Sequence, residues 1–306
     1  MNKLGLSKAT PRLFACLLAL APLAPPRAAA EDSAAHSGEP RLHWNPAWPH
    51  FRPIGYWLTG ASVLGAIGAT VLLKYPDDPR WRGGILFDDP LRDLLRARNP
   101  GARDAVRIAS DVTLLTSIAQ IAIIDSAILP FLDGSPGVAA QLSLINAQAF
   151  ALNILIATLL FKAVARERPL IPDCKRDPNF DPLCDTGAYA SFPSSHTSNA
   201  FTAAGLTCIH HAHLPIYGSK AWDVAACAES LALATATGLF RIIGDRHHTT
   251  DVLLGAAIGF SIGYFYPWLW HYRYGESAAA KPGEHKGSGS LTVLPLPTGL
   301  SLSGSF

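Results

Sequence analysis

The sequence predicts an all-α protein, a bundle of about six core helices associated with a membrane. The 306 residues are 49% apolar and only 16% charged, with a mean hydropathy of +0.20. The apolar runs are longer than the roughly four to eight residues typical of strands. This composition excludes a disordered or collagen-like chain. The net charge of +2, without a long basic run, gives no electrostatic basis for a nucleic-acid partner.

Six apolar segments of helical length follow one another, at about 54–73, 105–132, 138–164, 198–214, 222–243 and 252–270. The stretches 53–73, 134–161 and 252–270 contain no Asp, Glu, Lys or Arg and satisfy the requirement for a membrane span. The other three carry ionisable residues, which at membrane depth usually face a protein interior or a site. A partly embedded bundle therefore remains as possible as six clean spans.

The two ends of the chain differ from this helical domain, expected at 54–275. Residues 1–30 resemble a cleaved export signal, because basic residues precede the apolar run 13–23 and Ala28 to Ala30 offers a cleavage site. An irregular lead-in is expected at 31–53. The tail, 276–306, changes to Gly, Ser and short apolar runs and could form one short hairpin.

Cysteine usage agrees with an exported protein. Removal of the signal leaves Cys174, Cys184, Cys208 and Cys227, an even number. Cys174 and Cys184 bracket a polar loop and are the pair expected to form a disulfide in an oxidising compartment. The cysteine and histidine spacings suggest no zinc site, and no metal site is expected.

Three motifs carry charged or histidine residues at spacings that suit phosphate chemistry. In the first (161–169), Arg166 and Arg168 close an apolar helix, where they serve either an anion site or the helix end itself. In the second (193–196), Ser194 and His196 stand just before a helix. Backbone N–H groups there favour an anion, and an ordinary helix cap is the alternative.

The third motif (241–251) contains Arg241, His247 and Asp251 in the pattern R-x5-H-x3-D. A carboxylate four residues after a histidine can hold the Nδ1 proton of the imidazole and leave Nε2 free to attack, as in a catalytic triad. Asp251 also opens an apolar helix, so it is expected to cap that helix as well.

Together and in this order, the three motifs resemble the type 2 phosphatidic acid phosphatase superfamily, which includes bacterial acid phosphatases and vanadium haloperoxidases. The resemblance covers roughly residues 138–263. It implies a helical bundle with an extracytoplasmic site and hydrolysis of phosphate monoesters through a phosphohistidine, without a metal or other cofactor. Carried over by position, it makes His247 the nucleophile, Asp251 the orienting carboxylate and His196 the proton donor. The groups implied to hold the phosphoryl oxygens are Arg168, Ser194, Arg241 and the backbone N–H of Ser195 and His196.

Three positions depart from the family pattern. Phe161 stands where the family has a lysine, and the neighbouring Lys162 points about 100° away on a regular helix. Either the helix is distorted at this point, or Lys162 replaces that phosphate-binding lysine only in part. Ser195 replaces a glycine, and Phe240 replaces a serine. No catalytic role is assigned to the nearby Arg166, Arg246 and His248.

The resulting expectation is a phosphatase acting on a lipid phosphate or pyrophosphate at the periplasmic side of the membrane. One alternative is a soluble-type periplasmic acid phosphatase of broad specificity. A vanadium haloperoxidase is another, and the displaced lysine counts against it. A non-catalytic phospholipid-binding module is the last, and the oriented histidine argues against that, because a binder needs no nucleophile.

The export signal and the motifs together constrain the topology. A cleaved signal places Glu31 outside, so three crossings before Arg168 would bring the first motif into the cytoplasm. Segment 105–132, interrupted by Asp111 and Asp125, is therefore expected not to cross. That choice leaves the basic stretch 74–103 inside, as the positive-inside rule prefers. A wholly periplasmic bundle is the alternative.

Overall fold

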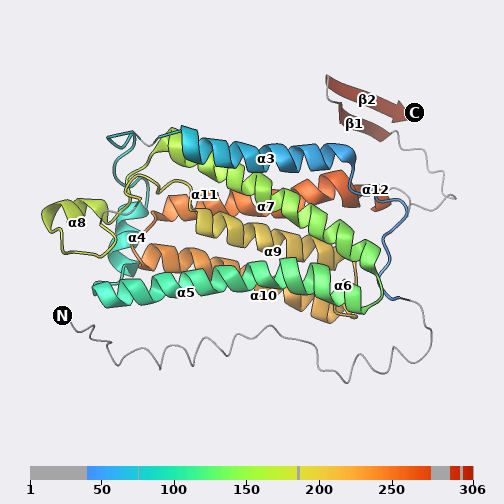
Figure 1. Ribbon diagram of the computed structural model, residues 1–306, viewed down its shortest axis with the longest axis horizontal. Coiled ribbons are helices and arrows are strands. Elements are labelled where there is room, and N and C mark those ends of the chain that lie inside the picture. The colour runs from blue at the N-terminus through green and yellow to red at the C-terminus, as the bar shows by residue number, and fades with distance from the viewer. Residues whose placement is uncertain (1–39, 75, 185–186, 277–289, 297–298, 306) are drawn as a thin grey trace.

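The structure, a computed structural model, describes residues 40–74, 76–184, 187–276, 290–296 and 299–305. The expected export signal at 1–30 lies outside the described residues. Figure 1 shows long helices lying side by side, with the short helices α4 and α8 gathered at one end of the bundle.

Six long helical stretches make up the described bundle, and several of them begin with proline, which suits the first turn of a helix. The predicted all-α bundle of about six core helices is confirmed. The stretches are α3 (Pro53–Leu72); α5 (Pro100–Ala119) with η2 (Gln120–Ile128) and α6 (Leu129–Leu132); α7 (Pro136–Val164); α9 (Ser195–His213); α10 (Lys220–Ile243); and α11 (Thr249–Phe260) with η3 (Ser261–Phe265), η4 (Trp268–Tyr272) and α12 (Arg273–Glu276). The short helices are α4 (Asp88–Leu95) and α8 (Ile171–Arg176).

The C-terminal tail contains two strands, β1 (Ser290–Leu296) and β2 (Gly299–Ser305). They pair antiparallel, with Ser290 opposite Ser305 and Leu296 opposite Gly299. This pair is the short hairpin that the tail composition suggested.

Helix α9 lies at the centre of the bundle, in contact with α5, α7, α10 and α11. Its packing against α11 and η3 is close because glycines face it. A Cβ added at Gly259 would lie 2.0 Å from the Ser198 carbonyl oxygen, and one at Gly263 would lie 2.2 Å from that of Thr202. The same packing places the start of α9 beside the start of α11, where the Ser194 N–H donates to the Asp251 carbonyl at 3.0 Å. The second and third motifs are thereby joined.

The outer faces of the bundle are apolar. On α3, Trp57, Leu64 and Val71 are each more than 70% exposed, which suits contact with lipid rather than water. Within the described residues, five stretches are long and apolar enough to cross a membrane, and they support membrane association. These are Pro53–Leu72, Pro100–Leu132, Pro136–Val164, Lys220–Ile243 and Thr249–Tyr272.

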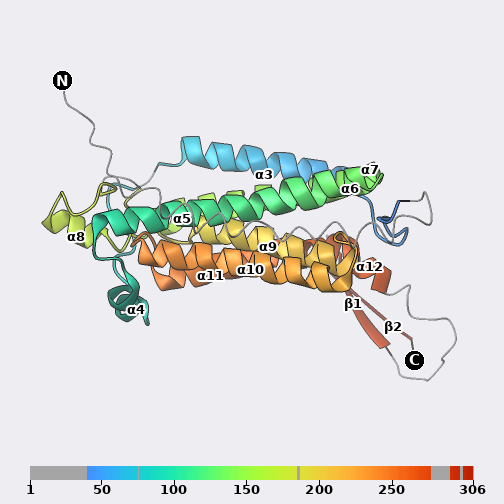
Figure 2. The ribbon, with the colours of Figure 1, turned by 90° about the horizontal axis from the view of Figure 1, so that it is seen from below.

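The two ends of the bundle are here called the site end, where α7 and α10 finish and α9 and α11 begin, and the opposite end, where α3 begins (Figures 1 and 2). The stretch 74–103 lies at the site end. The Arg80 N–H donates to the Ala165 carbonyl at 3.2 Å, and that of Ala97 donates to Ile243 at 2.9 Å. The expectation that 74–103 and the motifs lie on different sides is therefore wrong.

The reason for expecting segment 105–132 not to cross does not hold. The stretch from α5 to α6 runs from the site end to the opposite end as a 33-residue helical stretch with a hydropathy of 1.9. Both of its carboxylates have partners within the bundle. Asp125 is buried and accepts a hydrogen bond from Tyr217 at 2.9 Å, and Asp111 lies at the site end beside His196. Neither charge therefore prevents the segment from crossing.

Candidate active site

The first motif reaches the site through a sharp end to α7. The last turn closes at Ala165, whose φ of 44° is left-handed, a conformation common just past a helix C-terminus. The chain then continues as an extended segment that pairs Arg166 with Trp81. Arg168 follows, and its N–H donates to the Ala188 carbonyl at 2.8 Å. The motif is thus fixed by the loops around it.

His247 lies in the loop between α10 and α11 and is only 2% exposed. Its Nδ1 is 2.6 Å from the Ser191 carbonyl oxygen, an acceptor, so Nδ1 carries the proton. Its Nε2 lies 3.2 Å from Nη1 of Arg168. Burial, with the neighbouring guanidiniums of Arg168 and Arg241, holds the pKa of His247 well below its ordinary value. The ring is therefore neutral at pH 7, with the lone pair on Nε2.

Asp251 does not make the predicted contact with Nδ1 of His247, because the Ser191 carbonyl occupies that position. Its Oδ2 accepts a hydrogen bond from the Ser191 hydroxyl at 2.6 Å and another from the His248 N–H at 2.9 Å. Asp251 thus holds Ser191, and the carbonyl of Ser191 holds Nδ1 of His247. In this way the carboxylate orients the imidazole indirectly. The expected helix cap is confirmed, since Asp251 and His248 form a capping box at the start of α11.

Arg166, for which no role was predicted, is fully buried and holds Asp251 in place. Its Nη1 lies 2.6 Å from Oδ1 of Asp251, and its Nη2 lies 2.8 Å from Oδ2 of Asp88 on α4. Its guanidinium also stacks on the Trp81 ring at 4.0 Å. Burial raises the pKa of Asp88, but hydrogen bonds from the backbone of Ile85 and Thr250 and from Arg166 outweigh it and keep that carboxyl ionised. Arg166 is therefore one buried cation shared by two carboxyl groups, and burial raises the pKa of one of them, Asp251, to about 6.

His196, Arg241 and Asp111 meet at the start of α9. Oδ1 of Asp111 lies 3.0 Å from Nε2 of His196 and 3.5 Å from Nη1 of Arg241. Within the described part of the chain, the Nε of Arg241 is buried without a hydrogen-bond partner. Such an orphaned donor is costly unless a ligand satisfies it. The sequence offered one signal for Asp111, a carboxylate within an otherwise apolar helix.

The titration of His196 follows from these neighbours. Burial and the positive charge of Arg241 lower the pKa of His196 to about 4, and the contact with Asp111 opposes that shift. A phosphate dianion bound between the same cations raises the pKa again, because it brings negative charge. An anion bound there would therefore favour the protonated form of His196.

Ser194 and Ser195 form the N-terminus of α9. Ser194 is the N-cap, and its buried hydroxyl oxygen accepts hydrogen bonds from Thr197, at 3.4 Å from N and 2.9 Å from Oγ1. Its own hydroxyl proton remains available to donate. Ser195 and His196 are the first two helical residues, whose N–H groups lie beyond the reach of helical carbonyls. The second motif is therefore both an ordinary cap and a positive helix end suited to an anion.

Lys162 does not line this group. It lies on α7 beside a separate hollow of about 610 Å³, together with Lys74 and Arg80. The expected partial replacement of the family lysine has no support in this placement. The regular helix up to Val164 is the reason, because it keeps the one-residue offset between positions 161 and 162.

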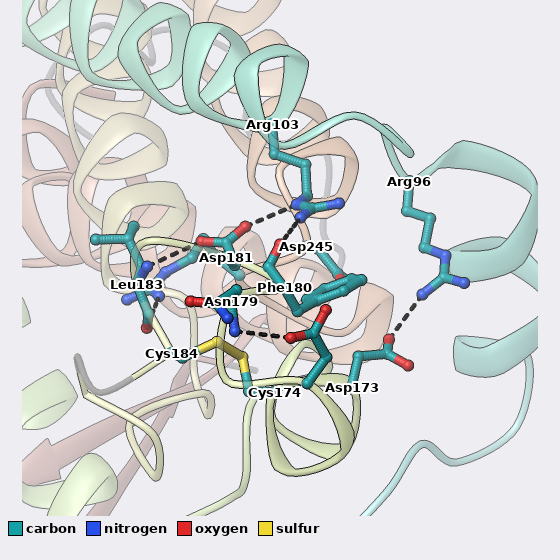
Figure 3. Close-up of a disulfide and its surroundings, with 12 residues drawn as sticks. Arg96, Arg103, Asp173, Cys174, Asn179, Phe180, Asp181, Leu183, Cys184 and Asp245 are labelled. Atoms are coloured by element: carbon teal, nitrogen blue, oxygen red, sulfur yellow. Dashed lines mark hydrogen bonds and ion pairs between the residues drawn. A yellow bond between two sulfur atoms is a disulfide. The ribbon is translucent and has the colours of Figure 1, made fainter.

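The loop between the first two motifs is held by the predicted disulfide between Cys174 and Cys184, which is confirmed (Figure 3). Asp181, also in this loop, is buried and binds Nε of Arg103 at 2.7 Å and Nη1 of Arg107 at 2.8 Å. Burial raises the pKa of Asp181, but the two arginines outweigh it and lower it to about 2. A second disulfide, Cys208–Cys227, joins α9 to α10 and was not predicted. Its partners lie on different helices, which sequence spacing does not reveal.

With this geometry in view, similarity to known proteins falls on the helical core. Residues 142–275 match the family model described as the PAP2 superfamily. An 86-residue stretch is 40% identical to the lipid A 1-phosphatase of Porphyromonas gingivalis, covering 28% of this chain and 17% of that protein. A 79-residue stretch is 38% identical to the probable diacylglycerol pyrophosphate phosphatase 1 of Schizosaccharomyces pombe, covering 25% of this chain and 28% of that protein.

The chain thus spans less than a third of the length of either relative. A solved transmembrane PAP2 type phosphatidylglycerolphosphate phosphatase from Bacillus subtilis aligns over 89% of this chain and 98% of its own, with 17% identity and a TM-score of 0.42. The matched residues 142–275 contain all three motifs. The resemblance drawn from the motifs is confirmed.

Proposed function

We propose that the protein is a phosphatase that hydrolyses a lipid phosphate or pyrophosphate through a phosphohistidine at His247. The observation that carries this proposal is the orientation of the His247 ring. Nδ1 is held by the Ser191 carbonyl at 2.6 Å, so the lone pair of Nε2 points toward Arg168 at 3.2 Å. A neutral imidazole beside an anion-binding cation is what nucleophilic attack on a phosphoryl group requires.

The proposed reaction has two steps. In the first, Nε2 of His247 forms a bond to phosphorus while the bond from phosphorus to the leaving oxygen breaks, and His196 gives that oxygen its proton. In the second, water attacks the phosphohistidine, His196 takes a proton from the water, and the phosphorus–nitrogen bond breaks to release inorganic phosphate. The same histidine serves as acid and then as base.

Fixed positive charges stabilise the transferring group. Arg168 and Arg241 lie near His247. The buried Nε of Arg241 has no acceptor among the described residues, so a phosphoryl oxygen can accept its hydrogen bond. The α9 N-terminus adds backbone N–H groups at Ser195 and His196. These groups face the charge that develops on the phosphoryl oxygens, which is the main catalytic demand of phosphoryl transfer.

A lipid is the favoured substrate because the site lies at one end of a bundle whose outer faces are apolar. Such a bundle holds the site at the level of lipid head groups while the acyl chains remain in the bilayer. The two relatives have names that refer to lipid A and to diacylglycerol pyrophosphate. Both names agree with a lipid that carries a terminal phosphate.

Phosphate release by the purified full chain tests the activity. Reactions contain EDTA and either a lipid phosphate in mixed micelles or a soluble aryl phosphate. We expect release from the lipid to exceed release from the aryl ester, to persist in EDTA and to be inhibited by vanadate. Equal turnover of both substrates would favour the broad-specificity alternative. Activity that EDTA abolishes and only a divalent metal restores would contradict the mechanism.

The site end is proposed to face the periplasm. The disulfide between Cys174 and Cys184 lies in the site-end loop, and disulfides persist in oxidising compartments. The positive-inside rule favours the reverse, because the basic stretch 74–103 is also at this end. Those arginines have structural partners, however: Arg92 and Arg96 bind Asp173, and Arg103 binds Asp181. We therefore give the disulfide more weight.

This orientation conflicts with the expected cleavage of an export signal. If α3 crosses the membrane, residues 40–52 and the three motifs lie on opposite sides. A periplasmic site then places 40–52 in the cytoplasm, which is incompatible with an exported start at Glu31.

Labelling in intact cells with a membrane-impermeant maleimide tests the orientation. Pro90→Cys reports on the site end, and Asn45→Cys reports on the opposite end. We expect position 90 to react at once and position 45 only after permeabilisation. The reverse pattern would place the site in the cytoplasm. Reaction at both positions would show that α3 does not cross.

A further inference from the structure

A second basic hollow, outside the candidate active site, lies at the site end between the last turns of α3 and α7. Its volume is about 610 Å³. None of the motif residues His247, His196, Arg168 and Arg241 lines it. The position of Lys162, one residue from where the family has its lysine, brings an additional cation to this hollow. The proposed phosphatase chemistry therefore does not account for this hollow.

The lining of the hollow has two chemically distinct parts. One part is cationic and consists of Lys74, Arg80 and Lys162. The other is apolar and includes Leu72 on α3, which is 78% exposed, and Leu159 on α7, which is 43% exposed. None of the described residues that line it is acidic. A ligand with one anionic group and an adjoining hydrocarbon chain matches both parts.

The position of the hollow along the helices matches the same ligand. Leu72 is the last residue of α3, a candidate membrane span, and Lys74 comes two residues later. The cations therefore stand where the apolar span ends, which is the level of lipid head groups. Arg80 is anchored there, because its Nη1 donates to the Ala163 carbonyl at 2.8 Å and its N–H to that of Ala165 at 3.2 Å.

We propose that this hollow binds an anionic phospholipid of the surrounding membrane. The phosphate would lie among Lys74, Arg80 and Lys162, and an acyl chain would lie along Leu72 and Leu159. Basic pockets between membrane helices recognise acidic head groups in this way. The proposal depends on membrane association and on this lining, not on the proposed phosphatase activity.

The stretch that follows Arg80 links the hollow to the catalytic framework. Trp81 packs under the guanidinium of Arg166 at 4.0 Å, and the Trp81 carbonyl accepts the Glu167 N–H at 2.9 Å. A lipid bound at the hollow would therefore lie against the stretch that supports Arg166, the partner of Asp251. Binding there would stabilise this stretch without contact with the reacting atoms.

Native mass spectrometry of the full chain, released from nanodiscs that contain phosphatidylglycerol and phosphatidylcholine, tests the proposal. Phosphatidylglycerol is a phosphodiester, so the proposed phosphatase leaves it intact. We expect wild-type protein to retain phosphatidylglycerol in preference to phosphatidylcholine. Combined Lys74→Gln, Arg80→Gln and Lys162→Gln substitutions should weaken that retention about a hundredfold, given the usual contribution of basic residues near an anionic membrane surface.

A matched control removes three exposed cations from the same end of the bundle, with Arg82→Gln, Arg98→Gln and Arg176→Gln, and should retain the lipid as wild type does. A double variant, Lys74→Gln with Lys162→Gln, leaves the Arg80 anchor intact and covers the case in which the triple variant does not fold. It should weaken retention about thirtyfold. Equal retention of the two lipids by wild type, unchanged retention in the double variant, or displacement of the lipid by an equal concentration of glycerol phosphate would overturn the proposal.

Discussion

The two ends of the bundle both bury polar side chains, but they satisfy them differently. At the opposite end, His211 has both ring nitrogens engaged, Nδ1 by Asp223 at 2.7 Å and Nε2 by Asp125 at 3.3 Å. At the site end, Nε of Arg241 is buried without a partner, and Nε2 of His247 meets only the cation Arg168 in its described contacts. The ring nitrogens of His211 are thus paired with carboxylates, whereas at the site end a buried guanidinium nitrogen and an imidazole nitrogen face the space that the proposed phosphoryl group would occupy.

The comparison shows that burial alone does not mark the functional end. His210 at the opposite end is as buried as His247, yet it contacts the Tyr272 hydroxyl at 2.7 Å and the Asn146 amide oxygen at 2.9 Å. Such a histidine stabilises a core. At the site end, the unprotonated Nε2 of His247 instead faces the guanidinium of Arg168, a cation that suits a phosphoryl group.

The largest expected difference between the two ends concerns one arginine from each. Arg168→Ala should lower kcat/KM at least about a thousandfold, because in the proposed mechanism it removes a cation that contacts the transferring phosphoryl group. Arg273→Ala at the opposite end, where the side chain contacts only Tyr274 in its described contacts, should leave kcat/KM unchanged. Steady-state kinetics on the lipid phosphate measure both. Equal losses in the two variants would remove the distinction between the ends.

The next contrast pairs two buried carboxylates. Asp181→Asn leaves Arg103 and Arg107 without their shared partner and should cost about 3 to 5 kcal/mol in the free energy of unfolding. Asp223→Asn at the opposite end should also destabilise the fold, yet leave kcat per folded molecule unchanged. Thermal unfolding and active-site titration separate these effects. A fall in kcat for Asp223→Asn would show that the opposite end takes part in catalysis.

The Asp181 network also has a predicted pH dependence. Because the pKa of Asp181 is lowered to about 2 in the folded protein, its contribution to stability is present above its ordinary pKa of 3.8. That contribution is lost as the pH falls from about 4 to about 2. Asp181→Asn should therefore flatten the acid limb of stability against pH, which unfolding measurements over that range detect.

The smallest effect is expected at Asp111, which contacts His196. Asp111 raises the pKa of His196, so Asp111→Asn lowers it and moves the alkaline fall in kcat toward lower pH by about one unit. Asp104→Asn, on the same helix and also exposed, makes the same charge change without that contact. The pH profile of Asp104→Asn should match wild type. Coinciding profiles for Asp111→Asn and wild type would contradict the role of Asp111.

The sequence predicted the helices and the motif residues because both are local patterns. The six apolar stretches lie within a few residues of the observed helices, and His247, His196, Arg168 and Arg241 meet at one end as the motif resemblance implied. The contact of Asp251 was mispredicted, since the spacing that suits a triad also suits a capping box. In the structure, Asp251 caps α11, and the Ser191 carbonyl accepts the Nδ1 proton of His247.

The parts that sequence could not supply depend on distant residues. Arg166 pairs with Asp88, 78 positions away, and Asp111 reaches His196 across 85 positions. The stretch 74–103 was predicted on the wrong side of the membrane for the same reason. Its charges were assigned to a cytoplasmic loop, but salt bridges such as that between Arg92 and Asp245 tie it to the site end. Periodicity describes one helix at a time and does not determine which loops meet.

The central claim is that His247 becomes phosphorylated, and one measurement tests it most directly. The purified full chain is mixed with a lipid phosphate labelled in its terminal phosphate, quenched in acid within the first turnover, returned to alkaline pH and digested for mass spectrometry. We expect an alkali-stable, acid-labile phosphoryl group on the peptide that contains His247, and none in His247→Ala. A label on another residue, or turnover by His247→Ala at the wild-type rate, would contradict the account.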